Sequence, residues 1–303
     1  MVEFKGRRDK NVKPAPFKYH DPHSVDELIG LMGSLENAKL LAGGQSLGPM
    51  LNFRYLMPDH LIDLNRIKDM SDIRIEGSRI HVGAMARQRV LEKHEGLKAL
   101  CPILNEALLQ VGHFQTRNRG TIGGSMSHLD PAAEQPGIMA LYDAVLEVAG
   151  PSGRRQVPIA NWGMGYMTPN LDSNEVLLGL TWNAWEGPHG YAFIELARRR
   201  GDFAIAGVAC LAALDQSGAV ARSSIILIGI GTAPVRLTAA EQLLKGSPLD
   251  DQTIPAAAAE VAKIEANGDL FASSSYRQHI AGVLLKRALK LAGERARAAS
   301  QNR

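Results

Sequence analysis

Residues 119–134, which read RGTIGGSMSHLDPAAE, constrain the folding of this chain more than any other stretch. The glycine pair at 123–124 can adopt backbone angles closed to other residues, and it lets a ligand approach the main chain closely. Thr121, Ser125 and Ser127 place hydroxyl groups beside the glycines, and this combination suits a phosphate. A single segment of this kind is more often a tight turn between buried elements, so the interpretation depends on a second segment.

The second segment is LLAGGQSLGPMLNFR, residues 40–54, in which a short apolar run ends in Gly43-Gly44. The expected geometry is a strand followed by a glycine turn. Backbone N–H groups converging from two such turns would satisfy the charges of a dinucleotide pyrophosphate without any lysine. Neither segment matches the GxGxxG or GxxxxGK[ST] loops of other nucleotide sites. The residues alone predict a phosphate or dinucleotide site, with two purely structural turns as the alternative.

Other kinds of chemistry are poorly supported by the sequence. Cys101 and Cys210 are the only cysteines, so the chain cannot by itself hold a four-cysteine iron–sulfur cluster or a zinc knuckle. The histidines form no HExxH spacing and there is no GxSxG elbow, so neither a metal site nor a catalytic dyad is predicted. The Asp130/Glu134 pair could either cap a loop or bind ligand hydroxyls. A run such as Arg198–Arg200 is more often a charged strand end than a phosphate-binding site.

Charge and hydropathy narrow the possible partners and compartments. The net charge of +3 indicates neither nucleic acid nor an acidic membrane surface as a partner. No run of about 18 apolar residues could span a membrane, and no signal peptide is evident at the start of the chain. Two isolated thiols are typical of a reducing compartment. We therefore expect a cytoplasmic protein.

Periodicity predicts a mixed fold in two parts. At 303 residues the chain is long enough for two domains of about 150 residues each. After an extended arm up to about residue 16, strands are predicted at 40–42, at 59–67 and on either side of a turn at 77–78, and helices at 24–34, 88–98 and 103–111, with a further helix and strand after 134.

The sequence pattern changes at about residues 185–190, where we expect a domain boundary. The segments GYAFIEL, FAIAGVACLAAL and SSIILIGIGTAP that follow predict three antiparallel strands. One helical stretch between 239 and 266 and another at 276–297 should cover one face of this sheet.

Several segments together resemble one known family. LLAGGQSLGPMLNFR and RGTIGGSMSHLDPAAE are similar to the two flavin-binding signatures of the FAD-binding medium subunit of molybdenum hydroxylases. This family includes aerobic carbon monoxide dehydrogenase, xanthine dehydrogenase and the bacterial N-heterocycle dehydrogenases. The resemblance covers nearly the whole chain and extends to KPAPFKYHDPHSVDELIGLM, NWGMGYMTPNLDSNEVLLGL, ELARRRGDFAIAGVA, GIGTAPVRLTAAEQLLKG and SSYRQHIAGVLLKRAL.

The resemblance implies an α+β fold of the vanillyl-alcohol-oxidase (PCMH) type. A two-lobed FAD-binding domain would span residues 1–187, with a small lobe at about 1–63 and a larger lobe at about 64–187. A C-terminal domain of the CO dehydrogenase flavoprotein type, a three-stranded antiparallel sheet with helices, would span residues 188–303.

The resemblance also assigns cofactor-binding positions, with no catalytic residue and no metal ligand. These are Leu40, Leu41, Ala42, Gly43, Gly44, Gln45, Ser46, Leu47, Val111, Thr121, Ile122, Gly123, Gly124, Ser125, Glu134 and Leu177. Glu134 would contact the sugar portion of the flavin, and the Leu177 backbone its ring system. The chain departs from many members at Ser125, where asparagine is common, and at Glu134, where aspartate is common. It also lacks the lysine that some relatives carry near Glu195.

The implied function is electron transfer by FAD within a heterotrimeric molybdenum hydroxylase. A large molybdopterin subunit would carry the molybdenum cofactor, and a small iron–sulfur subunit the 2Fe-2S clusters. This chain would take electrons from the clusters and pass them to an external acceptor, and the assembly would be a dimer of heterotrimers. Two alternatives remain: a stand-alone FAD-dependent oxidoreductase acting directly on a small molecule, and a non-catalytic binding module.

Overall fold

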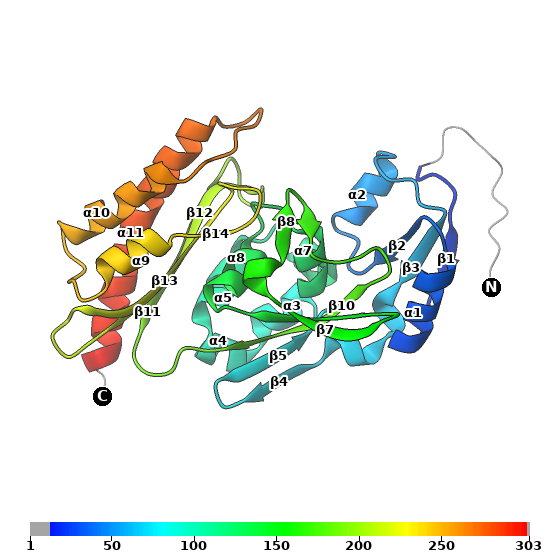
Figure 1. The fold of residues 1–303 in the computed structure, drawn as a ribbon, viewed down its shortest axis with the longest axis horizontal. Helices are drawn as coiled ribbons and strands as arrows, with labels where there is room; N and C mark the ends of the chain where they lie inside the picture. Colours follow the sequence, from blue (N-terminus) through cyan, green and yellow to red (C-terminus); the bar gives the residue numbers. More distant parts are fainter. Residues whose placement is uncertain (1–12, 302–303) are drawn as a thin grey trace.

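The small N-terminal lobe is built on a parallel sheet with strand order β1-β3-β2 (Figure 1). The computed structural model describes residues 13–301, so most of the expected N-terminal arm lies outside the described residues. The strands are β1 (Lys18–His20), β2 (Ala38–Leu41) and β3 (His60–Asp63), and the helices of this lobe are α1 (Val25–Ser34) and α2 (Leu47–Asn52).

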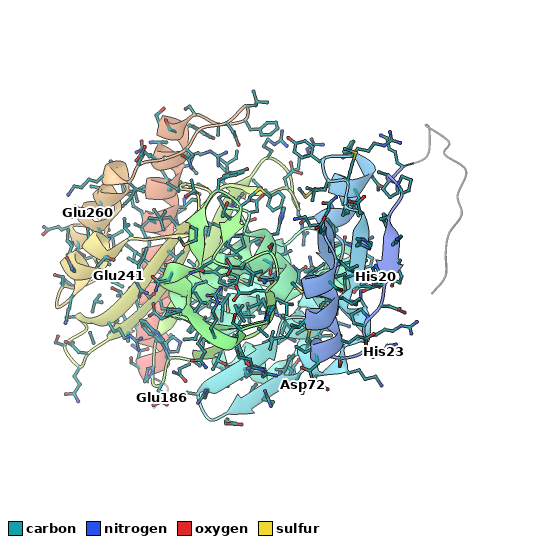
Figure 2. All side chains as sticks on the ribbon, turned by 45° about the vertical axis from the view of Figure 1, so that its right-hand side comes forward. His20, His23, Asp72, Glu186, Glu241 and Glu260 are labelled. Atoms are coloured by element: carbon teal, nitrogen blue, oxygen red, sulfur yellow. The ribbon has the colours of Figure 1, made fainter. Side chains whose placement is uncertain are left out.

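Side-chain contacts tie the N-terminal lobe together. Ser24 caps α1 as predicted, because the Glu27 N–H donates to its hydroxyl at 3.2 Å. His20, at the end of β1 (Figure 2), lies 2.9 Å from a ring nitrogen of His60 on the neighbouring strand. The predicted strand at 59–67 is shorter than expected, since 3-10 turns at Leu64–Arg66 and Lys68–Ser71 follow β3.

The larger lobe contains a five-stranded antiparallel sheet with order β4-β5-β10-β6-β7. Its strands are β4 (Ile73–Glu76), β5 (Arg79–Gly83), β6 (Val145–Gly150), β7 (Gly153–Pro158) and β10 (Val176–Asn183). The predicted hairpin turn at 77–78 is confirmed. A short hairpin of β8 (Gly163–Gly165) and β9 (Thr168–Pro169) follows the 3-10 turn at Ile159–Asn161.

Short helices connect β5 to β6 and bury one face of this sheet. They are α3 (Gln88–Lys93), α4 (Glu95–Leu100), α5 (Pro102–Gln110), α6 (Phe114–Arg119), α7 (Ile122–His128) and α8 (Glu134–Leu141). The prediction of one helix over 88–98 is wrong. The chain leaves the helical conformation at His94, whose ring nitrogen accepts the Leu97 N–H at 3.3 Å and so caps α4.

The C-terminal part is an antiparallel sheet covered by helices (Figure 1). The three predicted strands are β11 (Gly190–Ala197), β12 (Ala204–Leu214) and β13 (Val220–Ile228), and a two-residue strand, β14 (Val235–Arg236), extends the sheet to four. The helices are α9 (Thr238–Leu244), α10 (Thr253–Ala259) with a 3-10 turn at Glu260–Lys263, and α11 (Ser274–Gln301).

Both faces of the C-terminal sheet are buried. Val208 and Cys210 on β12 belong to an apolar core shared with α9, α10 and α11. The alternate residues Ala209 and Leu211 belong to the core of the larger lobe, as the period-two geometry of a strand requires. The sheet therefore joins the helical layer to the larger lobe. Neither cysteine forms a disulfide, and both are buried. None of the helices within residues 13–301 combines the length and hydropathy of a bilayer-spanning segment.

Candidate functional site

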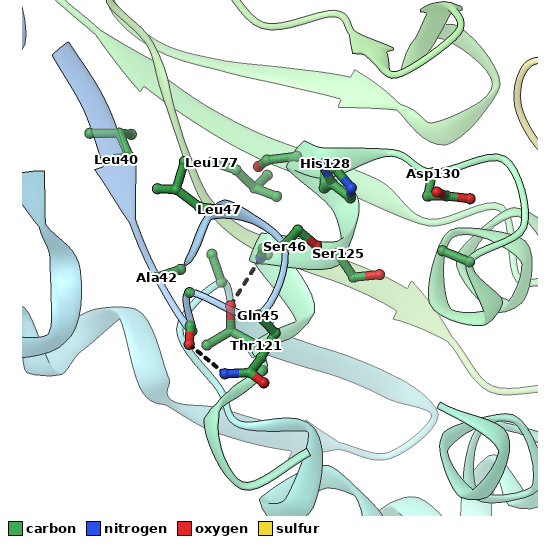
Figure 3. Close-up of a pocket in the computed structure, with 18 of the residues that line it drawn as sticks. Leu40, Ala42, Gln45, Ser46, Leu47, Thr121, Ser125, His128, Asp130 and Leu177 are labelled. Atoms are coloured by element: carbon green, nitrogen blue, oxygen red, sulfur yellow. Dashed lines mark hydrogen bonds between the residues drawn. The ribbon is translucent and has the colours of Figure 1, made fainter. Parts of the chain in front are cut away.

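A cavity of about 750 Å³ lies where the two lobes and the turn after β11 meet. All the binding residues predicted from the sequence line it except Leu41 and Ile122. Figure 3 shows Ala42 and Ser46 from the first glycine segment close to Thr121 and Ser125 from the second. The two segments, far apart in the sequence, therefore meet at one site as expected, while Ile122 is fully buried in the apolar core.

The first glycine segment presents free main-chain donors to the cavity. Between β2 and α2, the N–H groups of Gly44, Gln45 and Ser46 donate to no acceptor within residues 13–301. Gly44 has φ +71, a conformation that glycine adopts without strain. The Gln45 side chain folds back onto the Gly43 carbonyl at 3.1 Å. A cluster of unpaired N–H groups in a turn is a site for an anion such as a phosphate.

Gly43 lies directly against the backbone of the larger lobe. A Cβ atom at this position would lie 2.3 Å from the Arg119 carbonyl oxygen and 2.8 Å from the Gly120 Cα atom. Only glycine allows the two segments to approach this closely. Gly43 therefore fixes the position of the first segment relative to the second.

The second glycine pair is not a turn, and this corrects the prediction. Gly123 and Gly124 lie in the first turn of α7, and Thr121 is the helix N-cap, its hydroxyl accepting the Gly124 N–H at 3.0 Å. The Gly123 N–H donates to the Ala84 carbonyl at 2.8 Å, and the Ser125 N–H to the Thr121 carbonyl at 3.2 Å. These donors are already satisfied, so a clamp of free N–H groups from both segments does not exist.

Glycine is required at position 123 for close packing and not for a turn. A Cβ there would lie 2.4 Å from the Ala84 side chain, so α7 can pack against the end of β5 only without one. From the second segment, the Ser125 and Ser127 side chains remain available at the cavity wall.

A polar bridge that the sequence did not indicate joins the two segments. Asn65 donates through its side-chain amide to the Ala42 carbonyl at 3.1 Å. The Arg87 guanidinium donates to the Asn65 side-chain oxygen and to the Arg119 carbonyl. Burial lowers the pKa of Arg87, which remains a cation at neutral pH. This bridge fixes both glycine segments from behind the cavity wall.

The acidic residues after α7 have different roles. Asp130 accepts the Ala132 N–H at 2.8 Å, so it stabilises the loop before α8. Glu134 is only 5% exposed and faces the cavity, and burial raises its pKa to about 8. Burial also lowers the pKa of His128, another wall residue. The cavity therefore contains a carboxyl and an imidazole that both favour their neutral forms.

Much of the cavity wall is apolar. Leu177, a wall residue, lies on β10 where the pairing with β6 shifts register between Leu177 and Gly179. Further apolar wall residues that sequence reasoning missed are Met50, Leu56, Met85, Met167, Leu171 and Phe203. They belong to four separated stretches of the chain, at 50–56, 85, 167–171 and 203, so no single local pattern could have grouped them.

The Arg198–Arg200 run directly follows β11. Arg198 and Arg199 contact Asp202 at 3.4 and 3.7 Å, and the Arg198 guanidinium lies 3.8 Å from the centre of the Phe271 ring. These contacts favour a charged segment beside the strand over a phosphate-binding site.

Unpaired amide donors and an apolar wall in one cavity fit a ligand that carries both phosphate and a flat ring system. The two-lobed mixed fold with this cavity between its lobes defines a flavin-binding protein of the PCMH type.

The comparisons with known proteins agree with this class. Residues 15–181 match the family model described as the FAD binding domain in molybdopterin dehydrogenase, and residues 191–292 match the CO dehydrogenase flavoprotein C-terminal domain. The chain belongs to the FAD-binding medium subunits of molybdenum hydroxylases of the carbon monoxide dehydrogenase type.

Individual relatives match over almost their whole length. The carbon monoxide dehydrogenase medium chain of Hydrogenophaga pseudoflava is 37% identical, covering 93% of this chain and 99% of the relative. The 6-hydroxypseudooxynicotine dehydrogenase complex subunit alpha of Paenarthrobacter nicotinovorans is 36% identical, covering 94% and 97%. A solved structure of the Hydrogenophaga pseudoflava carbon monoxide dehydrogenase that lacks the Mo-pyranopterin moiety matches with a TM-score of 0.90 and 38% identity, covering 94% of this chain and 99% of that chain.

Proposed function

We propose that this chain takes electrons from the iron–sulfur clusters of a small partner subunit and passes them to an external acceptor. A large molybdopterin subunit would oxidise the substrate at its molybdenum cofactor. The observation that carries the proposal is the cavity between the lobes, which combines unpaired amide donors with an apolar wall. The near-complete coverage of a carbon monoxide dehydrogenase medium chain supports a subunit role over a stand-alone enzyme.

Each part of the cavity has a separate task in this proposal. The Gly44, Gln45 and Ser46 amides hold the pyrophosphate, and Glu134 faces the sugar chain. Bound FAD supplies reversible electron transfer, which the side chains themselves cannot perform. The apolar wall around Leu177 excludes water from the ring system. The remaining predicted residues, Leu40, Ala42, Gly43, Leu47, Val111, Thr121, Gly123, Gly124 and Ser125, shape the wall around these contacts.

Three further points belong to the same proposal. The complete assembly is a dimer of heterotrimers, as the family resemblance implies. The FAD-binding domain ends at about residue 187, between β10 and β11. The protein is cytoplasmic, in keeping with two free buried thiols.

The proposal is tested by purifying the complex through a tag on this chain, co-expressed with the genes beside its own. We expect two further chains, one FAD for each copy of this chain, and both iron and molybdenum, with a native mass of two heterotrimers. A protein purified alone that reduces its flavin with a small molecule, without iron or molybdenum, would instead support the stand-alone oxidoreductase. A colourless chain that cannot be reconstituted with FAD would exclude both.

A further inference from the structure

Two carboxyl groups from different parts of the fold interact electrostatically, and one of them lines the cavity. Glu134 begins α8 and faces the cavity. Glu195 lies on β11, and its Oε2 atom is buried with no hydrogen-bond partner. The negative charge of Glu195 disfavours ionisation of the Glu134 carboxyl. No sequence pattern connects these residues, because α8 and β11 come from the two halves of the chain.

Among residues 13–301, neither carboxyl is paired with a cation, and the hydrogen bond to the Glu134 carboxyl comes from its own backbone N–H. Within residues 13–301, no ion pair and no side-chain hydrogen bond to another residue is formed by Glu134 or Glu195. Other acids nearby are paired: Glu92 with Arg117 at 2.7 Å, and Glu106 with Arg295 at 2.8 Å. A buried carboxylate without a partner is costly and takes up a proton instead.

The surrounding charges do not remove this effect. Burial, followed by the charge of Glu195, raises the pKa of Glu134 to about 8. The hydrogen bond from its own backbone N–H opposes this increase, Asp130 adds to it and Arg117 opposes it. Burial alone raises the pKa of Glu195 to about 7. The titratable or charged groups on the neighbouring elements include Glu106 on α5, Arg117 on α6, His128 on α7, Cys210 on β12, Arg222 on β13, Arg236 on β14, Arg295 on α11, and Asp130 and Asp202 in loops.

We propose that Glu134 and Glu195 form a proton-holding carboxyl pair, in which Glu134, at the wall of the FAD cavity, takes up a proton when the cofactor binds. The inference rests on the proposed function only in taking FAD as the ligand. FAD displaces water from the Glu134 carboxyl and adds the negative charge of its pyrophosphate. Both changes favour the protonated acid, so binding and proton uptake are linked. A protonated Glu134 can then donate a hydrogen bond to an oxygen of the ligand.

The test measures protons rather than turnover. FAD is titrated into the cofactor-free protein by calorimetry at pH 8, in two buffers with different enthalpies of ionisation. The difference in apparent binding enthalpy gives the number of protons exchanged. We expect the wild type to take up a substantial fraction of one proton, and its FAD dissociation constant to rise by up to about tenfold per pH unit above pH 8.

Variants assign the proton to its site. Glu134→Gln should reduce the uptake to nearly zero, and Glu195→Gln should move the uptake to lower pH, because it removes a negative charge that Glu134 feels. Glu265→Gln is the matched control, since Glu265 is an exposed acid far along the chain, and it should behave as the wild type.

The outcomes separate this inference from the proposed function. Tight FAD binding by the wild type without proton uptake between pH 7 and 9 would overturn the proposal of a carboxyl pair and leave the proposed function standing. Equal uptake by the wild type and Glu134→Gln would do the same. Failure of the wild type to bind FAD under any condition would overturn both proposals.

Discussion

A single methyl group added at Gly43 should strongly weaken cofactor binding. In Gly43→Ala the new Cβ meets the Arg119 carbonyl oxygen, a backbone atom that cannot turn aside. Overpacking of this kind costs about 1–3 kcal/mol. Because the strain separates the two glycine segments, we expect the FAD dissociation constant to rise by about tenfold or more, as measured by flavin fluorescence titration.

Gly48→Ala is the control for this change. Gly48 belongs to the same segment, in α2, and a Cβ there meets no atom within 4 Å. It should bind FAD as the wild type does. If the two variants bound FAD equally well, the close contact between the segments would not govern affinity.

Glu134 should make the cofactor-free protein less stable as the pH rises. Its pKa is raised from 4.5 to about 8 in the folded state. The stabilisation from protonation is therefore fully present below the unfolded pKa and is lost as the pH rises through about 8. The free energy of unfolding should fall by up to about 1.4 kcal/mol per pH unit in this window from Glu134 alone.

Glu134→Gln removes this dependence, since the amide does not titrate. Urea unfolding at pH 6, 7.5 and 9 should show the variant gaining stability relative to the wild type, by about 2–5 kcal/mol at the highest pH. Glu265→Gln should follow the wild type throughout. Parallel pH profiles for Glu134→Gln and the wild type would mean that Glu134 is ionised in the folded protein.

At the scale of elements, the position of the small lobe depends on one polar bridge behind the cavity. Asn65 follows β3 and holds the Ala42 carbonyl of the first glycine segment. Asn65→Ala removes this bond and one Arg87 contact. Loss of hydrogen bonds to a charged group costs about 1.5–3 kcal/mol, so we expect FAD affinity to fall by about tenfold, with a smaller change in melting temperature.

Asn105→Ala is the matched control, because Asn105 makes a similar bond to the Glu92 carbonyl at 2.7 Å but holds neither glycine segment. It should lower stability without weakening FAD binding. Equal losses of FAD affinity in both variants would indicate a general effect on folding instead of a specific bridge.

The sequence predicted those elements whose cause is local. The Ser24 cap, the hairpin turn at 77–78 and the long strands of the C-terminal sheet follow from neighbouring residues, and all are present. The second glycine pair was assigned to a turn because its real constraint is distant. Gly123 is required by the Ala84 side chain across the lobe, which the order of residues around 123 does not reveal.

The same reason explains which site residues could be predicted. The main-chain donors at Gly44 to Ser46 lie in one short segment, so their chemistry was readable from the sequence. Asn65 and Arg87 contribute through contacts between separate elements. Each of these residues alone looks like an ordinary surface or strand residue, so no signal in the sequence identifies them.

At the scale of the whole molecule, the C-terminal sheet belongs to two cores at once. Leu211 and Ile226 bury their side chains in the core of the larger lobe. The Ser224 hydroxyl donates to the Leu141 carbonyl at 2.8 Å, and the Gly229 N–H to the Pro131 carbonyl at 2.8 Å. The C-terminal part also supplies Gly201, Asp202 and Phe203 to the cavity wall. The FAD-binding part therefore depends on it for both stability and a complete site.

This dependence predicts the behaviour of a chain cut at the proposed boundary. Residues 1–187 alone would expose the apolar surface that now packs against β12 and β13, and exposed patches of this kind lead to association. We expect this fragment to elute from gel filtration as an aggregate and to retain no FAD. Co-expression of residues 188–303 as a second chain should restore a one-to-one complex that binds FAD, because the contacts between the parts are non-covalent. A monomeric fragment 1–187 with wild-type FAD affinity would show that the C-terminal sheet is needed neither to keep this part folded nor to complete the FAD site.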